Sequence, residues 1–179
     1  MSILKVVRHS IKRGVVTILY PRVPIEVDEF YRGLPKLDPR LCIGCGACAN
    51  ACPPEAIRVE DRDGRKVWRI FYGRCIFCAR CQEVCPVGAI ELSKEFEAAS
   101  RSREDLVFEA IFEGAKCRAC GRYTGVTRRE VELAKEILSL SETPRELVEK
   151  LSEYASMCSD CKRKLLREKL AGVWRGGGS

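Results

Sequence analysis

Two stretches of the sequence decide the fold: CIGCGACANACP at residues 42–53 and CIFCARCQEVCP at residues 75–86. Both have the spacing Cys-x2-Cys-x2-Cys-x3-Cys-Pro, and the second begins 33 residues after the first. This run is typical of proteins that hold two 4Fe–4S clusters, in which the fourth cysteine of each run binds the cluster of the other half. The spacing therefore predicts that the chain transfers single electrons.

The run also predicts which cysteines share a cluster. A Cys-x2-Cys-x2-Cys loop supplies three inward-facing thiolates, and the fourth, just before proline, comes from the other half and ties the halves together. The predicted ligand sets are Cys42, Cys45, Cys48 and Cys85 for one 4Fe–4S cluster, and Cys75, Cys78, Cys81 and Cys52 for the other. Zinc is disfavoured at these positions, because all-thiolate zinc sites usually take their ligands as two pairs.

The other four cysteines form two Cys-x2-Cys pairs: Cys117, Cys120, Cys158 and Cys161. Four thiolates suit zinc, mononuclear iron or a small iron–sulfur cluster. The 37 residues between the pairs exceed the usual zinc-ribbon spacing. We expect a helical hairpin to close this gap, with a capping box of Thr127 and Glu130 at the start of its first helix. We favour a structural zinc ion, with rubredoxin-like iron as the alternative.

Composition narrows the class of protein. The chain has 179 residues, a net charge of +7 and 46% hydrophobic residues, with no apolar stretch near the ~20 residues of a membrane-spanning helix. The N-terminus lacks the pattern of a signal peptide, so we expect a protein of the cytoplasm or of the cytoplasmic side of a membrane.

Cysteines spaced this closely are poor disulfide partners and good chelators. No catalytic constellation is visible, so an active site is expected on a partner rather than in this chain.

The sequence of the N-terminal region predicts a helix followed by an extended segment. Ile3, Val7, Ile11, Val15 and Ile18 recur at helical spacing, which favours a helix over residues 3–19. Because residues 1–25 contain basic but no acidic side chains, this helix either lies on a membrane surface or membrane-embedded partner, or packs on its own domain. Residues 20–40 are rich in proline and predict an extended arm or a linker.

The remaining sequence predicts the elements around the ligands. In the repeat over residues 41–92, Asp63-Gly64 indicates a hairpin turn. The stretch 106–112 fits a strand or a short helix, and a basic helix should end near Ala171. We therefore predict an α+β fold with four parts: an N-terminal amphipathic helix and arm (1–35), a two-cluster ferredoxin domain (36–95), a small, mainly helical four-cysteine extension (96–175) and a linker (176–179).

The order of these features resembles a known family. A basic amphipathic helix precedes a Pro-rich arm with Tyr20-Pro21 and Arg32-Gly33, which leads into Asp38-Pro39-x-x-Cys42. Residues 1–95 thus look like the ferredoxin-like subunit shared by respiratory complex I and the membrane-bound NiFe hydrogenases. The resemblance implies docking beside the membrane arm and electron relay between other Fe–S subunits and a NiFe-type subunit. The four-cysteine extension departs from complex I and is similar to the version in formate hydrogenlyase complexes.

Three functional hypotheses follow. The leading one is an electron-relay subunit of a membrane-bound, hydrogenase-type oxidoreductase complex, bound peripherally on the cytoplasmic side. A free soluble ferredoxin would carry the same clusters but would leave the N-terminal helix and arm without a role. The third is a nucleic-acid-binding metal protein with a basic tail; aromatic residues for base stacking are sparse there, so no nucleic acid is expected as a partner.

Overall fold

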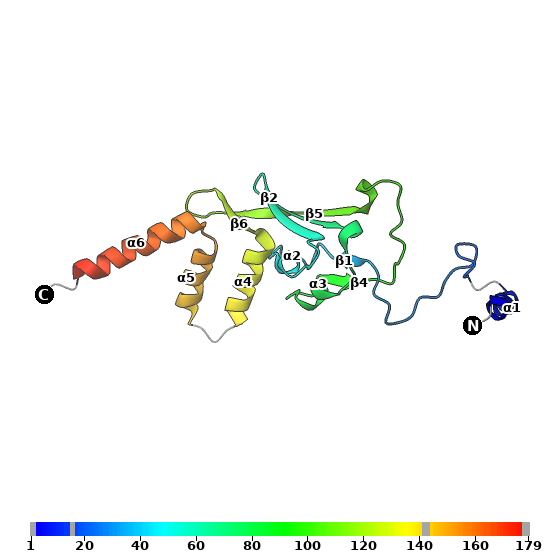
Figure 1. The fold of residues 1–179 in the computed structure, drawn as a ribbon. Coiled ribbons are helices and arrows are strands. Elements are labelled where there is room, and N and C mark those ends of the chain that lie inside the picture. The colour runs from blue at the N-terminus through cyan, green and yellow to red at the C-terminus, as the bar shows by residue number, and fades with distance from the viewer. Residues whose placement is uncertain (1–2, 15–16, 141–143, 177–179) are drawn as a thin grey trace. The chain divides into compact units, whose positions relative to one another are not determined.

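The computed structural model describes residues 3–14, 17–140 and 144–176 and divides the chain into two units, residues 1–31 and residues 32–179 (Figure 1). In the first unit, the helix α1 (Ile3–Arg13) exposes all its apolar side chains. The predicted range of 3–19 was wrong at its C-terminal end. Gly14 has φ +62, the left-handed conformation that ends many helices, and residues 17–19 are not helical. Within the described ranges, no helix is long and apolar enough to cross a membrane.

In the second unit, an antiparallel pair of strands joins the segment just before the repeat to the end of its second half. This pair joins β1 (Pro35–Leu37) to β4 (Ile90–Leu92). The pairing extends into the end of the arm, because the Gly33 N–H donates to the Ser93 carbonyl at 2.9 Å. A Cβ at Gly33 would lie 2.2 Å from a backbone oxygen, so this close approach requires glycine.

The sequence repeat is also a structural repeat. Each ligand loop leads into one short helix, α2 (Ala47–Asn50) in the first half and α3 (Arg80–Glu83) in the second. The residues just before these helices, Gly46 and Ala79, have positive φ values of 78° and 66°. Since these two positions are 33 residues apart, the same backbone turn recurs in both halves.

A four-stranded antiparallel sheet lies beside the ligand loops. Its order is β2-β3-β5-β6, with the bounds β2 Ile57–Arg62, β3 Arg65–Phe71, β5 Val107–Lys116 and β6 Tyr123–Thr127. Asp63 and Gly64 both have positive φ, which confirms the predicted hairpin turn between β2 and β3. Of the stretch 106–112, which fitted either a strand or a short helix, residues 107–112 are part of β5, and this strand pairs with the edge of β3 that β2 leaves free. Short 3-10 helices precede the second ligand loop (η1, Tyr72–Arg74) and β5 (η2, Glu104–Leu106).

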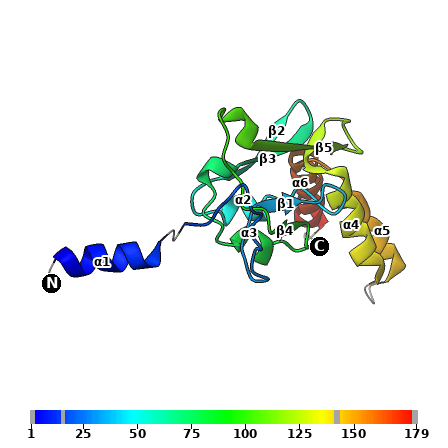
Figure 2. The same ribbon diagram turned by 90° about the vertical axis from the view of Figure 1, so that its right-hand side faces the viewer.

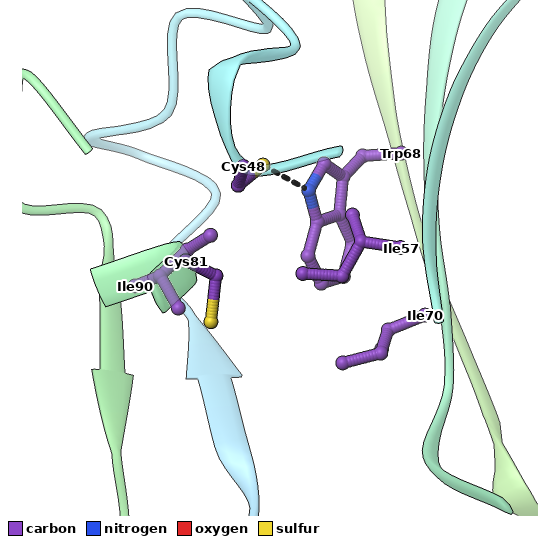
Figure 3. Packing of buried hydrophobic residues seen from close by; sticks show 6 residues of the cluster. All are labelled: Cys48, Ile57, Trp68, Ile70, Cys81 and Ile90. Atoms are coloured by element: carbon purple, nitrogen blue, oxygen red, sulfur yellow. Dashed lines mark hydrogen bonds between the residues drawn. The ribbon is translucent and has the colours of Figure 1, made fainter. Parts of the chain in front are cut away.

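The buried core lies between the sheet and the ligand loops. Figure 3 shows its members, Cys48, Ile57, Trp68, Ile70, Cys81 and Ile90. Trp68 and Ile70 come from β3 and are at most 1% exposed. Two cysteines of the predicted ligand sets thus belong to the hydrophobic core, so holding a cluster and folding the core depend on the same residues.

The C-terminal part continues from β6 into three helices, α4 (Arg128–Leu140), α5 (Arg145–Ala155) and α6 (Ser159–Gly176). Helices α4 and α5 pack side by side (Figures 1 and 2). The Glu130 N–H donates to Thr127 Oγ1 at 3.1 Å, which confirms the threonine half of the predicted capping box. The last helix runs to Gly176, beyond the expected end near Ala171, and residues 177–179 of the predicted linker lie outside the described residues.

Candidate iron–sulfur and metal centres

The first predicted ligand set lines one small apolar cavity, formed by Cys42, Cys45, Cys48 and Cys85 together with core side chains. Three of these cysteines come from the loop and helix of the first half, and Cys85 follows α3 in the second. Burial is the main cause that raises the pKa of Cys42 to about 11, and the charges of the other three thiolates add to it. The tertiary fold therefore brings the cysteine of the second half to the three of the first.

The second predicted set lines a second cavity in the same way, with Cys52, Cys75, Cys78 and Cys81 in its wall. Here Cys52 is the cysteine that comes from the other half. Burial raises the pKa of Cys75, and the charges of Cys52 and Cys78 raise it further. Four thiols around an apolar hollow, in each of two cavities, fit two 4Fe–4S cubanes.

Backbone N–H groups are directed at the cysteine sulfurs of both sets. The hydrogen bonds are Gly44 N–H to Cys42 at 3.4 Å, Phe77 N–H to Cys75 at 3.4 Å, Ala56 N–H to Cys52 at 3.3 Å and Ala89 N–H to Cys85 at 3.1 Å. Donors of this kind stabilise the negative charge of a reduced cluster. The loops therefore place both thiols and hydrogen-bond donors at the two cavities.

One side chain outside the predicted sites also contacts a predicted ligand. The Trp68 indole N–H donates to the Cys48 sulfur at 3.3 Å in the buried core (Figure 3). Trp68 lies 20 residues from Cys48 in the sequence and comes from the middle of β3. The sequence marks it only as a hydrophobic strand residue, so no pattern could have paired it with a cysteine.

The four remaining cysteines also meet. Cys117 and Cys120 lie in the turn between β5 and β6, while Cys158 and Cys161 lie where α5 ends and α6 begins. All four sulfurs lie within 4.8 Å of one another, and those of Cys120 and Cys158 are 3.7 Å apart. A tetrahedron with metal–sulfur bonds of about 2.3 Å has sulfur–sulfur edges of about 3.8 Å. The spacing therefore fits a single metal ion.

The surroundings of this site shift the pKa values of its thiols in different directions. The Cys158 N–H donates to the Cys117 sulfur at 3.2 Å, and this bond is the main cause that lowers the pKa of Cys117 to about 6. The neighbouring Arg122 lowers the pKa of Cys120. Hydrogen bonds to the other thiols raise the pKa of Cys161 to about 12. The lowered pKa of Cys117 and of Cys120 favours the thiolate, the form that binds metals.

Together, the fold and the cysteine positions define a ferredoxin-type protein with two candidate cluster sites and an added group of four cysteines that could hold a metal ion. In agreement, the family of 4Fe-4S dicluster domains matches residues 41–89. This match, with the architecture around it, confirms an iron–sulfur domain within a mixed helix-and-sheet fold.

More specifically, the chain belongs to the family of formate hydrogenlyase subunit 6. It is 42% identical to that protein of Escherichia coli K12 over 160 residues, which cover 88% of this chain and 87% of the relative. It is also 46% identical to NADH-quinone oxidoreductase subunit I of Psychrobacter arcticus over 104 residues, covering 52% of this chain and 57% of that protein. A solved structure of the membrane-bound sulfane sulfur reductase, an archaeal respiratory membrane complex, aligns with a TM-score of 0.44 and 33% identity over 59% of this chain and 60% of that chain.

The predicted resemblance to ferredoxin-like subunits of hydrogenase and complex I assemblies is thereby confirmed. The formate hydrogenlyase subunit matches 88% of this chain, whereas the complex I subunit matches about half of it.

Proposed function

We propose that this chain is an electron-relay subunit that passes single electrons between redox partners in a membrane-bound, hydrogenase-type complex. The observation that carries the proposal is the pair of cavities, each lined by three cysteines of one half and one of the other. Membership in the formate hydrogenlyase subunit 6 family supports the same role. The expected partners are other Fe–S subunits and a NiFe-type large subunit.

The eight cysteines are proposed as the cluster ligands in the two sets predicted from sequence. When bound, a 4Fe–4S cluster supplies a one-electron couple. The chain's own residues hold the sulfurs, donate backbone N–H groups to them and exclude water. Ile57 and Ile70 line the second cavity, and Ile90 lines the first. Because the two sets share one core, residues 36–95 would hold both clusters close together, which favours electron transfer between them.

The four-cysteine site is proposed to hold a structural metal ion, with zinc favoured over mononuclear iron. Residues 96–175 would then serve to fasten the turn between β5 and β6 to the junction of α5 and α6. The closeness of the four sulfurs supports one ion rather than a cubane. Such an ion stabilises the fold directly, because it binds the folded arrangement and not the unfolded chain.

The N-terminal unit is proposed to bind the membrane arm of the complex and to place the chain at the cytoplasmic side of the membrane. In α1, Ile3, Leu4 and Ile11 are 75–81% exposed, while Lys5, Arg8, Lys12 and Arg13 add positive charge to the same helix. An apolar stripe beside basic residues suits an interfacial helix or a subunit surface near anionic lipid. Within the described residues of this unit, α1 buries none of its side chains.

The decisive experiment is purification of the tagged full chain from gently solubilised membranes. We expect a NiFe-type large subunit and further Fe–S subunits to copurify in fixed ratio. A purely soluble, monomeric pool with intact clusters would contradict the relay proposal and favour a free ferredoxin. Salt-sensitive binding of DNA or RNA by the chain would support the nucleic-acid alternative instead.

The role of α1 can be tested separately. Replacing Ile3 and Ile11 by serine removes apolar contact area and leaves the cluster sites in the other unit intact, so membrane association should fall while the iron content stays the same. The matched control is Ser10→Ala, which removes only a hydroxyl that bonds within the helix to the Val6 carbonyl. Equal membrane association of the double variant and the control would refute the proposed role of α1.

A further inference from the structure

The hydrogen bonds to the eight predicted cluster ligands follow the repeat of the sequence almost completely. The donors to Cys42 and Cys75 are 33 residues apart, and so are the donors to Cys52 and Cys85. The third cysteine of each run, Cys48 or Cys81, receives the backbone N–H of the residue that follows it. Because these donors match in kind and position, they stabilise charge to a similar degree in both halves and do not distinguish the two clusters.

Trp68 breaks this symmetry. Its indole N–H gives Cys48 an additional hydrogen bond, at 3.3 Å, from a side chain that is 1% exposed. The position that the repeat would pair with Trp68 is Arg101, an exposed residue in the connector after the second half. The counterpart of Cys48 is Cys81, which belongs to the same core, and Figure 3 shows no hydrogen bond from it to the other residues drawn.

The position of the indole is fixed by its packing. Trp68 lies in the central part of β3, where its neighbours Val67 and Ile70 are also buried. Its ring meets that of Phe108 on β5 edge-on, with centroids 6.2 Å apart and planes at 68°. The N–H group therefore points at the sulfur without having to reorganise when the charge of the site changes.

A hydrogen bond to a cluster sulfur favours the reduced state. Reduction adds one electron and makes the cluster and its thiolates more negative, and a donor at a charged acceptor is stronger than one at a neutral acceptor. Burial strengthens the effect, because water does not screen the bond. Hydrogen bonds to the sulfurs are among the features that set cluster reduction potentials.

We propose that Trp68 raises the reduction potential of the cluster held by Cys42, Cys45, Cys48 and Cys85 above that of the second cluster. This inference rests on the ligand assignment proposed above. Trp68 acts as a positioning residue, since it contacts a ligand sulfur and not a substrate. An electron that enters at the second cluster then moves to the first, which oxidises the second cluster by one electron and reduces the first by one, with no bond formed or broken.

The test uses the anaerobically purified full chain with both clusters present. Stepwise reduction followed by EPR gives the midpoint potential of each cluster. In Trp68→Phe we expect the higher of the two potentials to shift downward and the lower one to stay constant. A benzothiophene analogue of tryptophan at position 68 should give the same shift, because it keeps the two-ring shape and lacks the N–H. This isostere separates the hydrogen bond from any packing defect in the phenylalanine variant.

A spectroscopic measurement identifies which cluster is reduced first. In a Trp174→Phe background Trp68 is the only tryptophan of the chain, so 15N-indole labelling reports on it alone. At a solution potential that reduces only one cluster, pulsed EPR should show coupling of that cluster to the labelled nitrogen. The control Val67→Ala changes a buried neighbour of Trp68 on β3 that lines neither cavity, and it should shift neither potential.

The outcomes separate this inference from the proposed function. Absence of iron–sulfur signals from the full chain would refute the proposed function itself. Two intact clusters whose potentials are unchanged in both Trp68 variants would refute only the inference about Trp68. Coupling to the labelled nitrogen that appears only after the second cluster is reduced would likewise overturn it.

Discussion

Thr127 joins the C-terminal part of the chain to the loop of the first cluster. Its hydroxyl donates to the Ile43 carbonyl at 2.5 Å and accepts the Glu130 N–H at 3.1 Å, and the residue is 1% exposed. One side chain thus caps α4 and satisfies a carbonyl in the ligand loop. Replacing it by valine keeps the shape and removes both hydrogen bonds.

The size of the effect of Thr127→Val follows from these contacts. Loss of a threonine cap costs about 1 kcal/mol. Leaving a buried carbonyl without a donor costs about 1–2 kcal/mol more. The sum of about 2–3 kcal/mol corresponds to a factor of about 30–150 in a local opening equilibrium, since about 1.4 kcal/mol is a factor of ten.

Hydrogen–deuterium exchange on the anaerobic, cluster-loaded protein measures this opening. Peptides that contain the first turn of α4 should exchange faster by that factor, and those of the first ligand loop should follow. The matched control is Thr124→Val, which removes a hydroxyl bonded to the Ala115 carbonyl at 3.0 Å in a half-exposed position where water can replace it. The reasoning would be refuted if the exchange rates of these peptides in the Thr127→Val variant stayed within threefold of the wild-type rates or equalled those of the control variant.

Three further predictions concern the ligand loops and the third site. Gly44→Ala should destabilise the first cluster and speed its loss in air, because a Cβ at this position would lie 2.6 Å from the methyl group of Thr127. The control is Gly46→Ala, since Gly46 has a similar positive φ but open space around the added Cβ. Equal rates of cluster loss in the two variants would contradict the steric argument. Cys158→Ala should abolish binding of the third metal while iron and sulfide stay at the wild-type ratio, measured by elemental analysis; an unchanged metal content would exclude the site. Tyr123→Phe removes a hydrogen bond of 2.6 Å to Asp61 between β6 and β2 and should lower the free energy of unfolding by about 1 kcal/mol, measured by denaturation.

Much of the candidate site could be predicted from local sequence. The Cys-x2-Cys-x2-Cys-x3-Cys-Pro run specifies the sulfur positions because each loop is short and its geometry depends only on neighbouring residues. The hairpin at Asp63-Gly64 and the cap at Thr127 were predictable for the same reason, since turn and cap residues act within three or four positions.

The end of α1 illustrates a limit within local patterns. The apolar spacing continues to Ile18, whereas the helix stops at Arg13 because Gly14 adopts the left-handed conformation. Hydrophobic periodicity marks a face and does not mark where the backbone leaves the helix. The glycine at position 14 therefore indicates the end of α1 better than the apolar spacing does.

Contacts between distant segments depended on the tertiary structure alone. Residues 107–112 form a strand because the edge of β3 is available for pairing, and local propensity does not report whether such an edge is available. In the same way, Trp68 meets Cys48, and Thr127 meets Ile43 across 84 residues. The sequence by itself determined which cysteines are the candidate metal ligands, because ligand spacing is local. The fold decided which side chains surround those cysteines, because these contacts exist only once the sheet has packed against the loops.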